Sequence, residues 1–185
     1  LNTADFLSCN VSDGLGVGIS VSSGARASVL SCRMSRLRLV GIRVVGDASA
    51  TISHCDISDC GCGIRTSLSS TVSVASCVVG FNRHCGISCL TRSLVLVADC
   101  IVSNTTNGSG VSASQYSSAT LVGCLLAGNW RAGLEAAVDA RVTMHGNTAR
   151  HNRFGVFAKS HAFVTSRGDT LGPHNSRAGA AASLG

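Results

Sequence analysis

The chain repeats itself about every 23 residues, and this period constrains the fold more than any other feature of the sequence. One column of the repeat holds cysteine six times, then an amide and a carboxylate: Cys9, Cys32, Cys55, Cys77, Cys100, Cys124, Asn147 and Asp169. A second column is a glycine followed by an apolar residue, and its glycines are Gly18, Gly41, Gly63, Gly86, Gly110, Gly133, Gly155 and Gly179. The 185 residues are therefore expected to form eight copies of one structural unit.

Within a unit, apolar and polar residues alternate over short runs, which is the period of β-strands. In the segment 50–58, Ala50, Ile52 and Ile57 would face one way, whereas Thr51 and Ser53 would face the other. Two further columns are apolar in nearly every unit, three residues before and two residues after the cysteine column. So small a unit cannot bury its apolar face alone, but stacked copies can. The sequence predicts an all-β fold, a parallel β-helix solenoid of about eight coils of about 23 residues each.

The seventh unit, VTMHGNTARHNRFGVFAKSHA (residues 142–162), carries a family resemblance. It resembles the asparagine-and-glycine repeat of the β-helix domains in certain F-box proteins and in the SHC-binding spindle protein. The whole chain is similar to right-handed parallel β-helix proteins of the pectate-lyase-like superfamily. The resemblance implies a right-handed solenoid whose first column usually holds asparagine. It implies no single function, because this fold carries lyases, hydrolases, epimerases and non-catalytic binding domains.

The six column cysteines are predicted to be stacked thiols rather than disulfides. Stacked strands keep neighbouring Cβ atoms nearly as far apart as the Cα atoms, about 4.8 Å, whereas a disulfide prefers roughly 3.8 Å. We therefore expect a buried ladder of free thiols that act as small apolar fillers. Free thiols favour an intracellular compartment, cytoplasmic or cytoskeletal. The alternative is a secreted origin, since glycosylation sequons begin at Asn10, Asn104 and Asn107.

Four cysteines lie outside the column: Cys60, Cys62, Cys85 and Cys89. Cys62 and Cys85 precede the glycine of their coils, a position that is mostly apolar elsewhere, so both are expected in the core and His84 outside it. A zinc site of Cys60, Cys62, His84 and Cys85 is the alternative, but its spacing differs from well-attested zinc patterns. We predict no metal and no cofactor. The pattern leaves open the side on which Cys60 lies.

The acidic residues are dispersed. Asp13 and Asp59 share a turn position, but a coil bearing Arg36 separates them, and Asp47 and Asp139 share a column four coils apart. Polysaccharide-cleaving enzymes need neighbouring carboxylates to bind calcium or to act as acid and base. The chain is therefore predicted not to be an enzyme. A carbohydrate-binding or carbohydrate-active β-helix, similar to a polysaccharide lyase or hydrolase, is the alternative.

Basic side chains gather in the loop between the two columns. The formal net charge of +6 comes from 14 arginines and one lysine against nine acids. The loop residues concerned are Arg36, Arg38, Arg83, His84, Trp130, Arg131, Arg150, His151, Arg153 and Arg177. Stacking would place them along one edge of the rod. This edge is either a solvated turn region that keeps the rod soluble or a partner-binding site, since Arg and Trp are frequent interface hot spots. A second patch is Arg43 and Arg65, each two residues past its glycine and expected as neighbours on a flat sheet face.

These patterns lead to the hypothesis of a non-catalytic interaction or scaffold domain that binds an acidic protein segment, or an acidic glycan, along the arginine-bearing edge. Such a rod presents preordered surface at low entropic cost. Nucleic acid is not a predicted partner, because lysines and aromatics are few. No apolar run or leader predicts a membrane span or a signal peptide. Residues 1–185 are interpreted as a single β-helix domain of a longer protein, with flanking domains or self-association at the coil ends.

Overall fold

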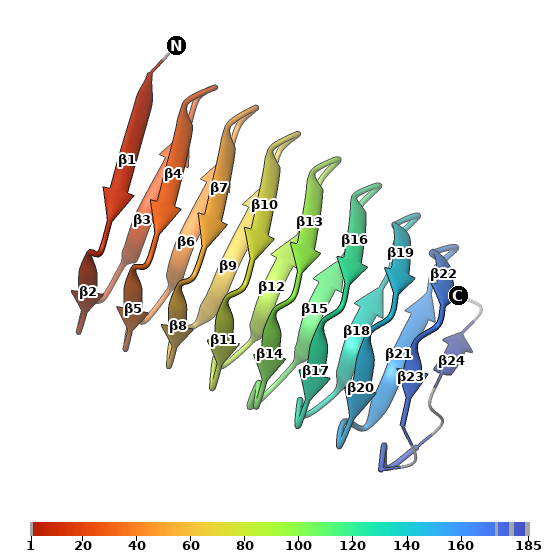
Figure 1. Cartoon of the computed structure of the whole chain (residues 1–185). Coiled ribbons are helices and arrows are strands. Elements are labelled where there is room, and N and C mark those ends of the chain that lie inside the picture. Colours follow the sequence, from red (N-terminus) through yellow and green to blue (C-terminus); the bar gives the residue numbers. More distant parts are fainter. Residues whose placement is uncertain (1, 173, 178–179, 184–185) are drawn as a thin grey trace.

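The computed structural model describes residues 2–172, 174–177 and 180–183, which form a rod of three parallel sheets (Figure 1). Sheet A contains β1 (Thr3–Leu7), β4 (Arg26–Leu30), β7 (Ser49–Ser53), β10 (Thr71–Ala75), β13 (Leu94–Ala98), β16 (Ser118–Val122), β19 (Arg141–His145) and β22 (Phe163–Arg167). Sheet B contains β2 (Asn10–Ser12), β5 (Arg33–Ser35), β8 (Asp56–Ser58), β11 (Val78–Gly80), β14 (Ile101–Ser103), β17 (Leu125–Ala127), β20 (Thr148–Arg150) and β23 (Thr170–Leu171). Sheet C contains β3 (Val17–Ser22), β6 (Val40–Val45), β9 (Cys62–Ser67), β12 (Cys85–Cys89), β15 (Ser109–Ala113), β18 (Ala132–Ala136), β21 (Phe154–Lys159) and β24 (Ala180–Ser183).

Successive coils stack in register, so each strand pairs with the strand three places further along the chain, as β1 does with β4 (Figure 1). In sheet A, for example, Ile52 of β7 lies beside Val74 of β10, which lies beside Val97 of β13. All three side chains are fully buried. The predicted solenoid and its eight coils are thus confirmed. None of the described residues forms a helix that is long and apolar enough to cross a membrane.

The core is a stack of apolar layers, each made by one residue from every sheet of a coil. In coil three these are Ile52 of sheet A, Ile57 of sheet B and Ile64 of sheet C, each 0% exposed. The alternating strand pattern therefore reports these three inward positions of coil three correctly.

Two corners flank sheet B in each coil, one towards sheet A and one towards sheet C. At each corner of coil three, a single residue has left-handed backbone dihedrals. His54 (φ 53°) precedes the A–B corner of coil three, and Asp59 (φ 56°) precedes its B–C corner. The residue after each, Cys55 and Cys60, then points into the core. This backbone conformation is unfavourable for residues other than glycine, although Asn and Asp tolerate it better than the rest. The tight corners are therefore stabilised by their neighbours rather than by local preference.

The column glycine is the second residue of each sheet C strand from β3 to β21. A Cβ at Gly63 would lie 2.6 Å from both the Gly86 carbonyl oxygen and Cγ1 of Val79. No side chain fits in that space, because real Cβ contacts are longer. Glycine in this column lets sheet C approach the core closely.

Candidate binding edge and thiol sites

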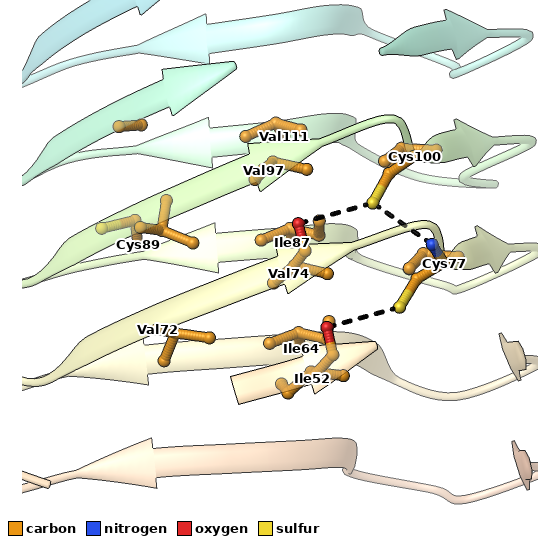
Figure 2. Close-up of a cluster of buried hydrophobic side chains, with 14 of the residues drawn as sticks. Ile52, Ile64, Val72, Val74, Cys77, Ile87, Cys89, Val97, Cys100 and Val111 are labelled. Atoms are coloured by element: carbon orange, nitrogen blue, oxygen red, sulfur yellow. Dashed lines mark hydrogen bonds between the residues drawn. The ribbon is translucent and has the colours of Figure 1, made fainter. Parts of the chain in front are cut away.

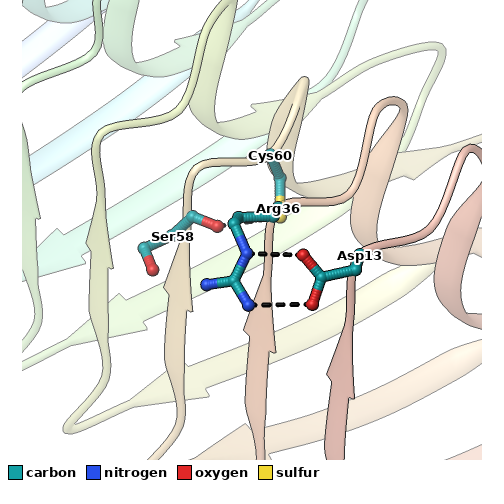
Figure 3. Close-up of polar contacts among 4 residues, drawn as sticks. All are labelled: Asp13, Arg36, Ser58 and Cys60. Atoms are coloured by element: carbon teal, nitrogen blue, oxygen red, sulfur yellow. Dashed lines mark hydrogen bonds and ion pairs between the residues drawn. The ribbon is translucent and has the colours of Figure 1, made fainter.

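The B–C corner carries two open grooves at opposite ends of the rod. The first, which we call the mixed groove, has a volume of about 530 Å³ and is lined by residues of coils one to five that include Asp13, Arg36, Asp59 and Arg83. Arg36 donates from Nε and Nη2 to the two carboxylate oxygens of Asp13 at 2.6 and 2.8 Å (Figure 3). This bond lowers the pKa of Asp13 to about 2. In the mixed groove, the positive charge of Arg36 is therefore neutralised by Asp13.

The second groove, which we call the basic groove, has a volume of about 510 Å³ and lies in coils six to eight. Its aromatic and basic side chains are Trp130, His151, Arg153, His174 and Arg177, and the described residues that line it include no Asp or Glu. Trp130 is the only tryptophan of the chain and is 57% exposed. The basic groove therefore combines uncompensated positive charge with an exposed aromatic ring.

Stacking holds the basic groove in shape. The rings of His151 and His174, from neighbouring coils, lie 5.0 Å apart and nearly parallel at 8°. The guanidinium carbons of Arg153 and Arg177 lie 5.7 and 5.9 Å from the ring centre of Phe154. Cation–π contact restrains an arginine while leaving its N–H groups free to donate. Both arginines are thus preorganised to bind an anion.

The structure divides the predicted edge into parts. Trp130, His151, Arg153 and Arg177 come together in the basic groove. His174 lines the same groove and Phe154 lies against the two arginines, and the sequence reasoning missed both. The mixed groove is lined by three other predicted edge residues, Arg36, Arg38 and Arg83.

The other predicted edge residues lie elsewhere. His84 is exposed in the turn before β12, and Arg150 ends β20 on sheet B with an exposed side chain. Arg131 turns to the outer face of sheet C, where its Nη1 lies 3.3 Å from a carboxylate oxygen of Glu135. Arg43 and Arg65 are register neighbours on β6 and β9, as predicted. A repeat alone could not separate these positions, because their directions depend on each turn.

Glu135, the only glutamate, is surrounded by partners on the outer face of sheet C. Lys159 Nζ lies 3.0 Å from its carboxylate, and Ser109 donates a 3.0 Å hydrogen bond to it. The Phe157 ring lies beside both Arg131 and Lys159, at 5.2 and 5.9 Å. Arg131 and Lys159 thus share one carboxylate, and Arg131 belongs to this cluster on sheet C rather than to the edge.

The column cysteines form a hydrogen-bonded ladder at the A–B corner, which we call the thiol ladder (Figure 2). Cys100 Sγ accepts the N–H of Cys77 at 3.4 Å, and the carbonyl oxygens of Ala98 and Val74, at 3.1 and 3.7 Å, are alternative acceptors for its single S–H. Cys77 repeats the arrangement with Cys55 and Ile52. All ten cysteines lie in the described part of the chain and none forms a disulfide. The predicted free-thiol stack is confirmed, but its description as apolar filling was incomplete, because the thiols also bond the corner backbone.

A second ladder, which the sequence reasoning missed, runs along the B–C corner. We call it the amide ladder, and it consists of Cys60, Asn82, Thr105, Asn129, Asn152 and Asn175. Asn152 Oδ1 accepts the N–H of Asn129 at 2.8 Å, and its Nδ2 donates to the Leu126 carbonyl at 2.9 Å. Cys60 is 2% exposed and belongs to the main core, which settles its side.

The zinc alternative is not supported by this geometry. Cys60 lies in the main core, whereas Cys62 and Cys85 pack with Val40 in a separate cluster. Over residues 2–172, 174–177 and 180–183, no group of three or more His, Cys, Asp or Glu side chains is placed to hold a metal ion.

Cys62 and Cys85 are buried, as predicted, but they lie in a small apolar cluster of their own with Val40 rather than in the main core. Gly63 and Ile64 both face inward, so strict alternation is broken and Cys62 lies on the outer face of sheet C. The pKa of the Cys62 thiol is lowered by its contact with the Cys85 thiol and by the nearby Arg65 guanidinium. By contrast, burial raises the pKa of the core thiols Cys89 and Cys124 to about 11.

Comparison with known proteins agrees with the architecture. The family model described as a right-handed β-helix region matches residues 2–137, which is more than half of the chain. No curated protein matches the sequence.

Proposed function

Because the chain belongs to the right-handed β-helix family, whose fold carries enzymes and binding proteins alike, we propose that it is a non-catalytic interaction domain that binds an acidic protein segment. The basic groove is the binding site. The observation that carries this proposal is the set of Trp130, His151, Arg153, His174 and Arg177 around one groove whose described lining has no acidic side chain.

The physical case rests on charge and preorganisation. Guanidinium groups bind carboxylates with two parallel hydrogen bonds, and each charge-assisted bond is worth about 1.5–3 kcal/mol. Arg153 and Arg177 are already restrained on Phe154, so binding costs less side-chain entropy. Trp130 adds an apolar anchor of the type that dominates interface hot spots.

The mixed groove is a weaker candidate for the same partner. Asp13 already accepts from two of the donor groups of Arg36, and Asp59 adds a second negative charge to the lining. An acidic segment would compete with Asp13 for Arg36 and would be repelled by both carboxylates. The two grooves therefore provide an internal comparison for a binding assay.

The test uses the fluorescence of Trp130, which reports on the basic groove because the chain has no other tryptophan. A peptide of alternating Glu and Asp, about ten residues long, is titrated into the wild type and into the double variant Arg153→Glu/Arg177→Glu. We expect the variant to lose at least about 100-fold in affinity, about tenfold for each arginine.

The matched control is Arg26→Glu/Arg141→Glu, which makes the same charge change on the exposed face of sheet A. It should bind as the wild type does, and all variants should keep their circular dichroism and urea midpoint. An equal loss of peptide affinity in both double variants would mean that only the net charge of the protein matters. That result would refute the basic groove as the binding site. Saturation of Trp130 by an acidic oligosaccharide, with no response to the peptide, would replace this proposal by the carbohydrate-binding alternative.

A further inference from the structure

Two thiols on the outer face of sheet C belong to neither ladder. Cys62 begins β9 and Cys85 begins β12, and the two residues are register partners in neighbouring parallel strands. Their side chains pack together with Val40, apart from the main core. We propose that this outer thiol pair is a binding site for a soft monovalent cation, Cu(I), held between two thiolates.

The positions of the sulfur atoms are repeated from one coil to the next. Cys62 Sγ donates to the carbonyl oxygen of Ile64 at 3.4 Å, and Cys85 Sγ makes the equivalent bond to Ile87 at 3.0 Å. Because both side chains make the same local contact, their sulfur atoms are displaced by about one strand spacing, roughly 4.8 Å.

This spacing discriminates between two uses of a thiol pair. A disulfide requires sulfur atoms about 2.05 Å apart, so the atoms would have to approach by more than 2 Å. Two metal–sulfur bonds of about 2.3 Å, placed end to end, span roughly 4.6 Å. A metal between the thiols therefore fits the existing backbone, whereas a disulfide requires strain.

Ligand number and softness select the ion. Zinc needs four ligands, and among the described residues no third Cys, His, Asp or Glu joins the pair in a metal-binding arrangement. Thiolates favour soft ions such as Cu(I), which accepts two-coordinate linear geometry. Binding releases one proton from each thiol to solvent and forms a bis-thiolate complex of net charge −1. The Arg65 guanidinium lies beside both thiols and balances that charge.

The thiol ladder does not offer the same site, although its sulfur atoms are stacked in the same way. Cys77 Sγ already accepts a backbone N–H from Cys55, and a metal between these rungs would separate that bond. It lies in the apolar core, and the buried residues in the described part of the chain include no Lys, Arg or His to balance two thiolates. Cys85, by contrast, is 8% exposed, whereas Cys77 is 1% exposed.

The test titrates Cu(I), supplied anaerobically as its acetonitrile complex, against a competing Cu(I) chelator, and follows the thiolate-to-copper absorption band. The wild type should bind one equivalent tightly. Cys62→Ser and Cys85→Ser should each lose at least about 100-fold in affinity, since loss of a second-shell partner alone costs 10–100-fold. Arg65→Glu should cost about tenfold and Arg65→Lys much less.

Cys100→Ser is the matched control, because it removes a stacked thiol from the ladder and should leave the tight equivalent intact. X-ray absorption of the wild type adds a measurement that needs no variant, and two sulfur neighbours are expected. Three or more sulfur neighbours, an unchanged affinity in Cys62→Ser and Cys85→Ser, or an equal loss in Cys100→Ser would each overturn the site. Failure of peptide binding at the basic groove would leave this result unaffected, since the two sites share no residue.

Discussion

The thiol ladder and the amide ladder run along the same rod at neighbouring corners and bond the same kinds of backbone group. In the thiol ladder, sulfur accepts the corner N–H at 3.3 to 3.4 Å. In the amide ladder, a carbonyl oxygen accepts it at 2.8 to 3.1 Å. Amides also bond to each other, as from Asn129 Nδ2 to Asn152 Oδ1 at 3.1 Å, and thiols make no equivalent bond of that kind.

The two ladders show two ways to provide hydrogen-bond partners for the buried backbone groups at a corner. An amide has a strong acceptor and two donors, so each rung bonds to both neighbouring coils. A thiol is a weak donor and weak acceptor, but its sulfur fills the corner as a small apolar group. The amide ladder should therefore depend on hydrogen bonding and the thiol ladder on packing, and each prediction below tests that contrast.

The largest effect is expected from Asn152→Ala. This change leaves the buried N–H of Asn129 and the Leu126 carbonyl without their side-chain partner. Each buried unsatisfied group costs about 1–3 kcal/mol, so we expect the free energy of unfolding to fall by about 3–4 kcal/mol. Cys77→Ala is the matched control in the thiol ladder and should cost only about 1–2 kcal/mol, because the bonds it removes are weak. Urea unfolding measures both, and equal losses would contradict the contrast.

Alkaline pH should weaken the thiol-bearing coils, because amides do not titrate. Burial raises the pKa of Cys89 and Cys124 to about 11, so the folded protein holds their protons more tightly than the unfolded chain does. Their contribution is complete below the ordinary cysteine pKa and is lost as pH rises towards 11. By pH 10.5 the loss should be about 2 kcal/mol for each thiol.

Urea midpoints between pH 8 and 10.5 measure this loss. The double variant Cys89→Ala/Cys124→Ser should show a flatter decline than the wild type, which separates these thiols from other groups that titrate in the same range. Parallel declines would show that the two thiols ionise normally in the folded protein.

The sequence predicted the coil, the core layers and the thiol ladder because each depends on a period that survives in nearly every unit. Ile52, Ile57 and Ile64 occupy the predicted inward positions of coil three. The amide ladder was missed because its column is mixed. Cys60 and Thr105 interrupt the asparagines, so the column has no single residue type to reveal it.

The site was harder to predict, since it depends on where strict alternation fails. Gly63 faces the core in the same direction as Ile64, which places Cys62 on the opposite face from the one its column indicated. The basic groove depends on turn geometry in the same way. His151 and His174 meet because their coils stack, and Phe154 lies beneath two arginines that the repeat shows only as neighbours along an edge.

The smallest expected effect comes from completing the amide ladder. Thr105 occupies a ladder position, but its buried hydroxyl is one of two side-chain polar atoms that lack a hydrogen-bond partner in the described part of the chain. Asparagine has nearly the same volume as threonine and, in the geometry of Asn129, would reach the carbonyl of the preceding coil. We therefore expect Thr105→Asn to raise the free energy of unfolding by about 1 kcal/mol, the value of one net hydrogen bond.

Thr105→Val is the control for Thr105→Asn, since it removes the unpaired hydroxyl without adding an amide and should be close to neutral or mildly stabilising. A gain with Val that equals the gain with Asn would mean that relief of an unsatisfied hydroxyl accounts for the effect. Stabilisation by Asn alone would mean that the ladder gains from an unbroken run of amides. Hydrogen exchange at Asn82 and Asn129 distinguishes these outcomes locally, because only a completed ladder should slow exchange in the coils on both sides of the substitution.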